Sequence, residues 1–481
     1  MVNNVPKSVD LMLSPVTHTC VTEGETRMFR DTRRRRRSII SASVALSLFA
    51  AGCGSDEKKS ESTTAATTAA TTAATTAATT AATTAASSAA STAASTAAST
   101  AEPSGDVCVD GDAVELGFLN STSGVMAISE QTVRDALLLA ADEINAAGGI
   151  MGKQIKWVEE DGQSEPTIFA EKINKLLTED KVAAVFGGWT SASRKAMLPV
   201  VEGANGLLFY PVQYEGLEAS KNIYYTGATT NQQIIPAMDF LKSKGVKTLF
   251  LAGSDYVFPR TANKIIKQYA KELGIEIVGE EYVPLDSDDW TTQVAKIAAA
   301  KPDFVFNTIN GSSNVGFIKA YDEAGLGPDN SPIISVSIAE EEAPAMGVDL
   351  TGQFAAWNYF ESVDSPTNAT FIKAFQAKYG ADRPTSDPME AAYTSLYLYK
   401  NMVEKAKSFC VDAVNAASGG VTFEAPEGTV TVNGENHHIA KTGLIGQINA
   451  DNQFDIVWTS DGPIEPDPFL EGYSWWDPNA G

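Results

Sequence analysis

Short apolar runs alternate with segments of helical periodicity from residue 113 onwards. An apolar run of about four to eight residues predicts a buried strand, and apolar residues repeated every three or four positions predict a helix with one packed face. The first series contains strands at 113–119, 153–159, 182–188 and 207–210, with helices that end near residue 147 and that cover 168–178 and 193–204.

The same rhythm restarts near residue 231. Strands separated by helices imply parallel sheets with right-handed crossovers. Two series of similar length therefore predict an α/β fold of two lobes, each a mostly parallel sheet flanked by helices. The second series contains strands at 248–252, 275–282, 304–308 and 333–336, with helices at 231–244 and 259–273 and helices that end at 300 and 324.

Polar and aromatic residues follow the strands of both series. Ligands of open α/β sheets bind beyond the carboxyl ends of the strands, so these junctions are the expected binding region. Lys and Arg are absent from all six junctions, whereas a phosphate or carboxylate ligand usually recruits one of them. A neutral polar ligand is therefore favoured, with an anion held by helix N-termini as the alternative. The junctions are 120–124, 188–191, 210–214, 253–256, 310–312 and 337–341.

The N-terminal region has the organisation of an export signal. An arginine run at 33–37 precedes a short apolar stretch and then Gly52-Cys53. The apolar stretch is too short to span a bilayer as a helix, and the cysteine resembles a bacterial lipidation site. We expect residues 28–52 to be a lipoprotein signal peptide and Cys53 to carry the lipid.

The segments on either side of this signal are interpreted from their position in the chain and their composition. Met28 begins a signal of normal length, so residues 1–27 are expected to be an overextended start. Residues 57–102 are mostly Thr, Ala and Ser and offer no apolar stripe to pack. We interpret residues 53–105 as a lipid anchor and a disordered tether.

The net charge and the small numbers of cysteine and histidine residues disfavour several classes of function. The formal net charge is −24, which disfavours a nucleic-acid partner. Four cysteines without a CxxC motif and three histidines give little basis for a metal site or a Ser-His-Asp triad. We expect no metal, no cofactor and no enzymatic activity, although Ser-Lys chemistry stays open. Cys108 and Cys410 are either a disulfide or free thiols.

Several blocks resemble a known family. Residues 148–150 and 159–162 are similar to periplasmic-binding-protein-like type I receptors of the branched-chain amino acid class. Within that class, other blocks resemble the amide and urea receptors. The blocks similar to the amide and urea receptors together are 188–196, 210–216 and 253–260. The blocks more similar to the binding protein of urea transporters are 337–342, 356–360 and 387–393.

The resemblance implies a two-lobed clamshell on the extracytoplasmic side of the cell membrane that delivers a solute to an ABC permease and its ATPase subunits. It implies no catalysis. Three crossovers are expected near 226–232, 345–357 and 420–430, which assigns 106–228 and 357–425 to lobe 1 and 229–356 and 426–481 to lobe 2.

The resemblance also suggests the ligand and its site. Urea is planar, with one carbonyl acceptor and four N–H donors that a closed cleft must satisfy. Trp189, Tyr210 and Tyr256 are the expected aromatic walls. Expected hydrogen-bonding residues are Ser123, Thr190, Ser191, Gln213, Asn310 and Glu340.

Some neighbouring residues receive other interpretations. Tyr214 is expected to pack, and Arg194 and Lys195 to form a solvated helix face or a domain contact. The alternative function is a receptor for short-chain amides or a branched-chain amino acid in the same transporter class. Glu340 or Asp255 would then face the ammonium group.

Overall fold

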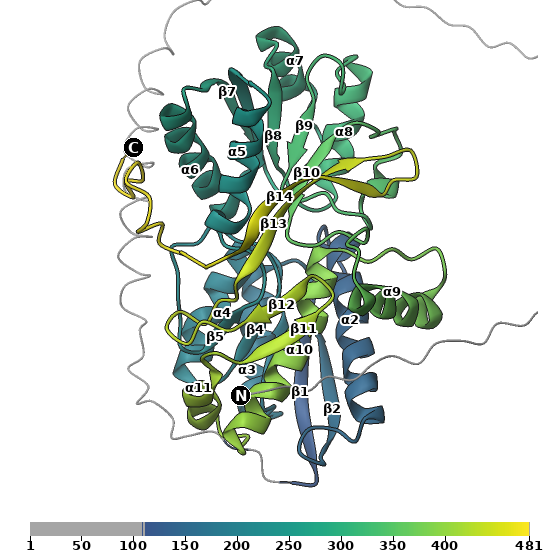
Figure 1. The fold of residues 1–481 in the computed structure, drawn as a ribbon, viewed down its shortest axis with the longest axis vertical. Coiled ribbons are helices and arrows are strands. Elements are labelled where there is room, and N and C mark those ends of the chain that lie inside the picture. Colours follow the sequence, from purple (N-terminus) through teal and green to yellow (C-terminus); the bar gives the residue numbers. More distant parts are fainter. Residues whose placement is uncertain (1–107, 109–110, 481) are drawn as a thin grey trace, which may run out of the picture. The chain divides into compact units, whose positions relative to one another are not determined.

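The computed structural model describes residue 108 and residues 111–480 (Figure 1). Cys53, the predicted signal 28–52, the segment 1–27 and the tether 53–105 lie outside the described residues. None of the described helices is both long and apolar enough to cross a membrane.

Lobe 1, the lower lobe of Figure 1, is built on a five-stranded sheet of order β2-β1-β3-β4-β5. All neighbouring strands of this sheet are parallel, as the alternation of strands and helices predicts. Its elements are β1 (Ala113–Asn120), α2 (Ala127–Ala146), β2 (Gln154–Asp161), α3 (Pro166–Thr178), β3 (Val185–Gly187), α4 (Ser191–Gly203), β4 (Leu208–Tyr210) and β5 (Ile223–Tyr225).

Lobe 2 contains a seven-stranded sheet of order β14-β13-β10-β9-β8-β6-β7. The sheet is parallel from β10 to β7, while β13 and β14 add to its edge as antiparallel strands. The elements are η1 (Thr230–Gln232), α5 (Ile234–Ser243), β6 (Thr248–Ser254), α6 (Val257–Leu273), β7 (Glu276–Val283), α7 (Thr291–Ala300), β8 (Phe304–Thr308), α8 (Ser313–Glu323), β9 (Ile333–Ser335), η2 (Ala343–Met346), β10 (Phe354–Trp357), β13 (Lys441–Ile448) and β14 (Phe454–Ile464).

The chain crosses between the lobes three times, and the third crossing falls later than the sequence predicts. The β11–β12 hairpin lies on α10 in lobe 1, where Phe423 stacks on Tyr397 with ring centroids 4.7 Å apart. The crossing therefore comes after Thr431, not near 420–430. The returning elements of lobe 1 are α9 (Pro366–Tyr379), α10 (Asp387–Ala406), α11 (Val411–Ser418), β11 (Thr422–Ala425) and β12 (Gly428–Thr431).

Each lobe has its own apolar core. In lobe 1, Phe209 stacks between Phe186 and Tyr224 at 4.8 Å on each side, so three neighbouring strands share one aromatic column. A disulfide joins Cys108, before β1, to Cys410, before α11. It fixes the beginning of the first strand to the helical end of the same lobe.

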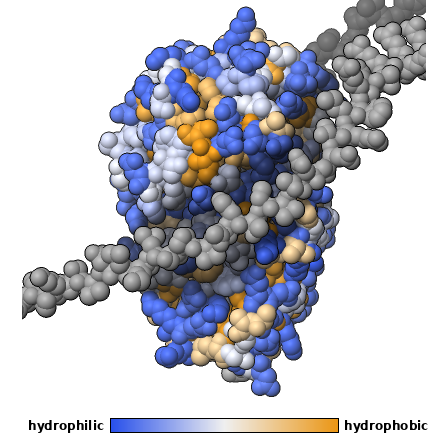
Figure 2. Space-filling model, turned by 45° about the vertical axis from the view of Figure 1, so that its right-hand side comes forward, coloured by the Kyte–Doolittle hydropathy of each residue, from blue (hydrophilic) through white to orange (hydrophobic). Residues whose placement is uncertain are grey.

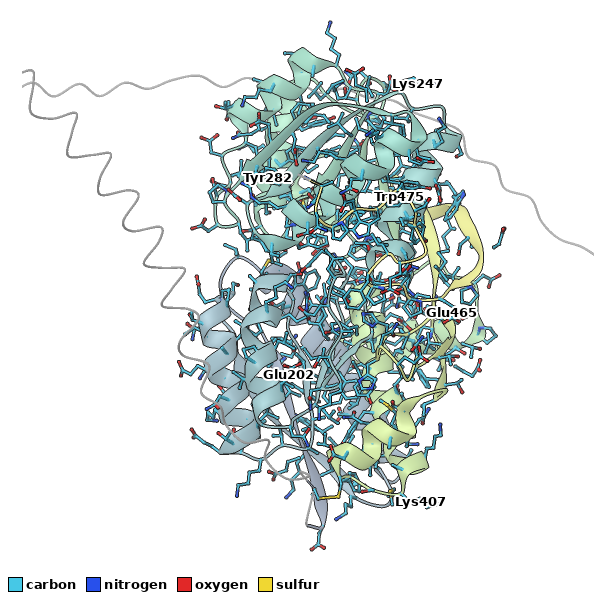
Figure 3. All side chains as sticks on the ribbon, turned by 90° about the vertical axis from the view of Figure 1, so that its left-hand side faces the viewer. Glu202, Lys247, Tyr282, Lys407, Glu465 and Trp475 are labelled. Atoms are coloured by element: carbon cyan, nitrogen blue, oxygen red, sulfur yellow. A yellow bond between two sulfur atoms is a disulfide. The ribbon has the colours of Figure 1, made fainter. Side chains whose placement is uncertain are left out.

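The C-terminal segment after β14 contacts both lobes. The backbone N–H of Leu217, in lobe 1, donates to the carbonyl oxygen of Pro468 at 2.7 Å. Trp475 then stacks on Tyr269 of α6 in lobe 2, with centroids 4.6 Å apart. Figure 3 labels Glu465, where this segment leaves β14, and Trp475 beside the upper lobe.

The surface is mostly hydrophilic on the face that Figure 2 shows, with small hydrophobic patches between the polar side chains. Large hydrophobic side chains that are substantially exposed include Met151, Val457 and Phe469. Scattered exposure of this kind is ordinary for a soluble domain and marks no interaction surface by itself.

Candidate functional site

Two hydrogen bonds join strand-to-helix junctions of opposite lobes. Trp189, which follows β3, donates from Nε1 to Oδ1 of Asn310, which follows β8, at 3.4 Å. Gln213, which follows β4, donates from Nε2 to the carbonyl oxygen of Val336, just after β9, at 2.8 Å. The carboxyl ends of the two sheets therefore face each other and the cleft between them is closed around these side chains.

The three predicted aromatic residues come from both sides of this cleft. Trp189 and Tyr210 are buried in lobe 1, and the Tyr210 hydroxyl donates to the carbonyl oxygen of Trp189. Tyr256, at the start of α6 in lobe 2, is partly exposed. Burial, and then the nearby Tyr210 phenol, raise the pKa of Tyr256, so both phenols stay neutral at physiological pH.

Thr190 and Ser191 are held by the first turn of α4. Thr190 caps the helix, because its hydroxyl accepts from the backbone N–H of Ser193 at 3.1 Å. The Ser191 hydroxyl donates to Glu215 and accepts from Nη1 of Arg194 at 2.9 Å. Both hydroxyls thus already have protein partners in this state.

Arg194 is fully buried, so the expectation of a solvated helix face is wrong for this residue. Its guanidinium lies 3.1 Å from Oε1 of Glu215 and 2.8 Å from Oε1 of Glu218, and 4.3 Å from the ring centroid of Tyr214. Burial alone would raise the pKa of Glu218, but the charge of Arg194 lowers it to about 2. Lys195 is exposed, with its Nζ 3.0 Å from Oε2 of Glu218.

Amide groups with unused hydrogen-bonding capacity lie at two of the lobe 1 junctions. Asn120, the last residue of β1, is buried, and neither Nδ2 nor Oδ1 has a partner among the described residues. The Oε1 atom of Gln213 is in the same condition. Asn120 stands in the first junction of the sequence, so its position at a strand end was the signal that could have placed it in the site.

Two predicted residues are engaged elsewhere. Ser123 is exposed and its hydroxyl donates to Oδ2 of Asp161 at 2.7 Å, within lobe 1. Glu340 is buried and accepts from the backbone N–H of Glu361 at 2.8 Å. The cavity beside Glu340 includes none of the other predicted site residues in its lining.

Sequence reasoning missed a group of carboxyls where lobe 2 meets the helices of lobe 1. Glu342 accepts from the Ser129 hydroxyl of α2, which forms a further contact between the lobes. Burial raises the pKa of Glu342 to about 8 and that of Glu341 to about 7. Glu130, next to Ser129, also has a pKa raised to about 8 by burial. These acids are expected to carry protons near neutral pH.

The comparison with protein families agrees with this architecture. A family model described as a periplasmic binding protein domain matches residues 114–474, which is most of the chain. The chain belongs to the periplasmic binding protein family. This membership gives an extracytoplasmic location, and the solved structures share the two-lobed type I fold.

Proteins similar to this chain are named for, or bound to, different ligands. A Leu/Ile/Val-binding protein homolog of Brucella melitensis is 24% identical over 346 residues, which cover 70% of this chain and 88% of the relative. A Rhodopseudomonas palustris solute-binding protein in complex with 4-hydroxybenzoate has a TM-score of 0.67 at 22% identity, with 72% of this chain and 96% of that chain covered. An isoleucine complex of a Streptococcus pneumoniae branched-chain amino acid transporter substrate-binding protein has a TM-score of 0.65 at 22% identity, with coverage of 74% and 100%.

Within the part of the chain that the structure describes, no group of three or more His, Cys, Asp or Glu side chains is arranged to hold a metal ion.

The two histidines of the body are packed against aromatic rings. His437 stacks on Tyr224 at 4.3 Å and His438 on Tyr225 at 4.2 Å. Burial lowers the pKa of His438 to about 3, so its ring is neutral at physiological pH.

Proposed function

We propose that this periplasmic binding protein captures urea between its lobes, is anchored to the membrane through a lipid on Cys53 and catalyses no reaction. The charge state of the site is the observation that supports urea as the ligand. Arg194 is neutralised by Glu215 and Glu218, while buried amides at the junctions keep unused donors and acceptors. Such a site suits a small neutral molecule rich in hydrogen-bonding groups.

The proposed binding mode uses the aromatic side chains and the buried amides of the site. Trp189, Tyr210 and Tyr256 would enclose the flat faces of urea. The Gln213 Oε1 and Asn120 Oδ1 atoms would accept from its NH2 groups, and Asn120 Nδ2 would donate to its carbonyl oxygen. Each of these atoms lacks another described partner and is buried, so a ligand that satisfies it removes a cost of about 1–3 kcal/mol.

The remaining predicted residues have supporting roles in this proposal. Asn310 positions the indole of Trp189 through their hydrogen bond, and Thr190 and Ser191 hold the start of α4. Closure of the two lobes around urea would create the surface that the permease and its ATPase subunits respond to. Ser123 and Glu340 are not part of the proposed urea site. Ser123 is exposed and donates to Asp161, and Glu340 lines a separate cavity that none of the other predicted site residues line.

A receptor for a branched-chain amino acid is the second candidate. The names of the Brucella and Streptococcus relatives, which refer to branched-chain amino acids, favour it. Both carboxyl oxygens of Glu341 are buried and without a partner in the described structure, and an ammonium group would satisfy them. The carboxylate of such a ligand would need donors that Arg194, already paired twice, does not offer.

A thermal-shift screen of the purified protein against urea, acetamide, formamide and leucine separates the two candidates. We expect the melting temperature to rise most with urea, because an acceptor that faces the second NH2 group loses its partner when a methyl group replaces it. A rise with leucine and none with urea would discard the urea assignment and keep the transport role.

A further inference from the structure

A cavity of about 230 Å³ lies beside Glu340, in the junction 337–341 that follows β9. Its walls come from the segment after β9, the segment after β10, the end of α9 with the residues that follow it, and the turn between β13 and β14. In Figure 1, α9 projects beside the region where the two lobes meet.

The lining of this cavity is acidic. Glu340, Glu361, Asp382 and Asp451 contribute four carboxyl groups, and Arg383 is the one cationic residue among the described residues that line it. Arg383 already forms an ion pair with Asp135 of α2, with Nη2 to Oδ2 at 3.1 Å.

Glu340 is the buried acceptor of the cavity. It is 1% exposed, and its Oε1 atom is used by the backbone N–H of Glu361 at 2.8 Å. Its Oε2 atom is buried and has no hydrogen-bond partner among the described residues. Burial, together with the nearby carboxyls of Glu341 and Glu361, raises the pKa of Glu340. A cation beside this carboxyl would favour its ionised form.

We propose that this cavity binds a compact organic cation with N–H donors, of the methylammonium or guanidinium class. The unpaired Oε2 atom of Glu340 would accept a charge-assisted hydrogen bond, and the half-buried Glu361 would add a second carboxylate. The side-chain carbonyls of Gln376 and Gln453, which also line the cavity, supply neutral acceptors. The volume is several times the ~30 Å³ that one water molecule occupies, which leaves room for such a cation.

Titration calorimetry at constant ionic strength tests the proposal with methylammonium and guanidinium chloride, each at millimolar concentration. We expect saturable binding with one site per chain. Tetramethylammonium, which has the charge and lacks N–H donors, should bind at least about 10-fold more weakly, because the hydrogen bond to Glu340 is lost. Saturating urea should leave the cation affinity unchanged, so this result is independent of the urea assignment.

Two variants locate the site. Glu340→Gln keeps the acceptor for the Glu361 N–H and removes the charge, and should weaken cation binding by about 10- to 100-fold. Glu435→Gln, an exposed acid outside the cavity, should bind like the unmodified protein. If Glu340→Gln melts at a much lower temperature, Glu361→Gln replaces it with the same expected loss.

Absence of saturable binding would overturn the proposal. So would equal binding of tetramethylammonium, unchanged affinity in both cavity variants, or tighter binding of calcium or sodium than of either organic cation. The last result would assign the cavity to a metal ion instead.

Discussion

Asn358, which follows β10, donates from Nδ2 to the carbonyl oxygen of Gln232 at 3.0 Å. The same nitrogen donates to the carbonyl oxygen of Thr442 at 2.8 Å. Gln232 belongs to the first crossing between the lobes, Asn358 to the second and Thr442 to the segment that completes the third. One buried amide thus ties all three crossings together.

Replacement of Asn358 by Ala should destabilise the protein by about 2 kcal/mol, because the buried carbonyl group of Gln232 and the partly buried one of Thr442 lose a donor. Thermal unfolding measures the loss. Asn330→Ala is the matched control, since the amide of Asn330 also donates to a backbone carbonyl, that of Gly325 at 2.9 Å, but is exposed. A loss of similar size in both variants would contradict the role of Asn358 at the crossings.

Replacement of Arg194 by Met should cost about 3–5 kcal/mol, because it leaves the buried carboxylates of Glu215 and Glu218 with only the exposed Lys195 as a counter-charge. Arg260→Met provides the comparison. Arg260 pairs with Asp255 at the surface, where both side chains are about half exposed, and its loss should cost about 1 kcal/mol or less. Equal melting temperatures for the two variants would show that the buried pairing contributes nothing special.

Stability should fall as the pH rises from about 6.5 to 8. Glu130 and Glu342 have pKa values raised to about 8 in the folded protein, so the folded state holds protons that the unfolded state has released above its own pKa near 4.5. The stability that these two carboxyls contribute is fully present below the pKa of the unfolded state, 4.5. It is lost as the pH rises through the pKa of the folded state, about 8. His437 and His438, whose pKa values are lowered to about 4 and 3, act in the opposite direction, but only below about pH 6.5.

Glu130→Gln tests this pH dependence, because it keeps an acceptor for the Ser121 N–H and cannot ionise. The slope of stability between pH 6.5 and 8 should decrease by up to about 1.4 kcal/mol per pH unit. Melting curves at several pH values measure it, with the exposed Glu435→Gln variant as control. An unchanged slope would mean that Glu130 is ionised in the folded protein.

The fold was predictable because the spacing of apolar residues along the chain indicates strands and helices directly. The buried runs that became β1, β6 and β8 and the helices between them have lengths and spacings that leave few alternatives. The third crossing was misplaced because β11 and β12 are short and largely polar, and only the long-range stack of Phe423 on Tyr397 decides which lobe they join.

The site was predictable in part. Trp189, Gln213 and Asn310 were chosen from strand ends, and they do form contacts between the lobes. The burial of Arg194 could not be read locally, because Glu215 and Glu218 lie more than 20 residues further along the chain. The position of Glu340 depends in the same way on a distant backbone group, that of Glu361.

Isothermal titration of the purified protein with urea tests the central claim most directly, with Trp189→Ala as the site variant and Trp475→Ala as the control. We predict saturable one-to-one binding that acetamide does not match, weakened about 10-fold or more by Trp189→Ala and unaffected by Trp475→Ala. No binding of urea together with saturable binding of leucine or isoleucine would contradict the account and assign the cleft to an amino acid.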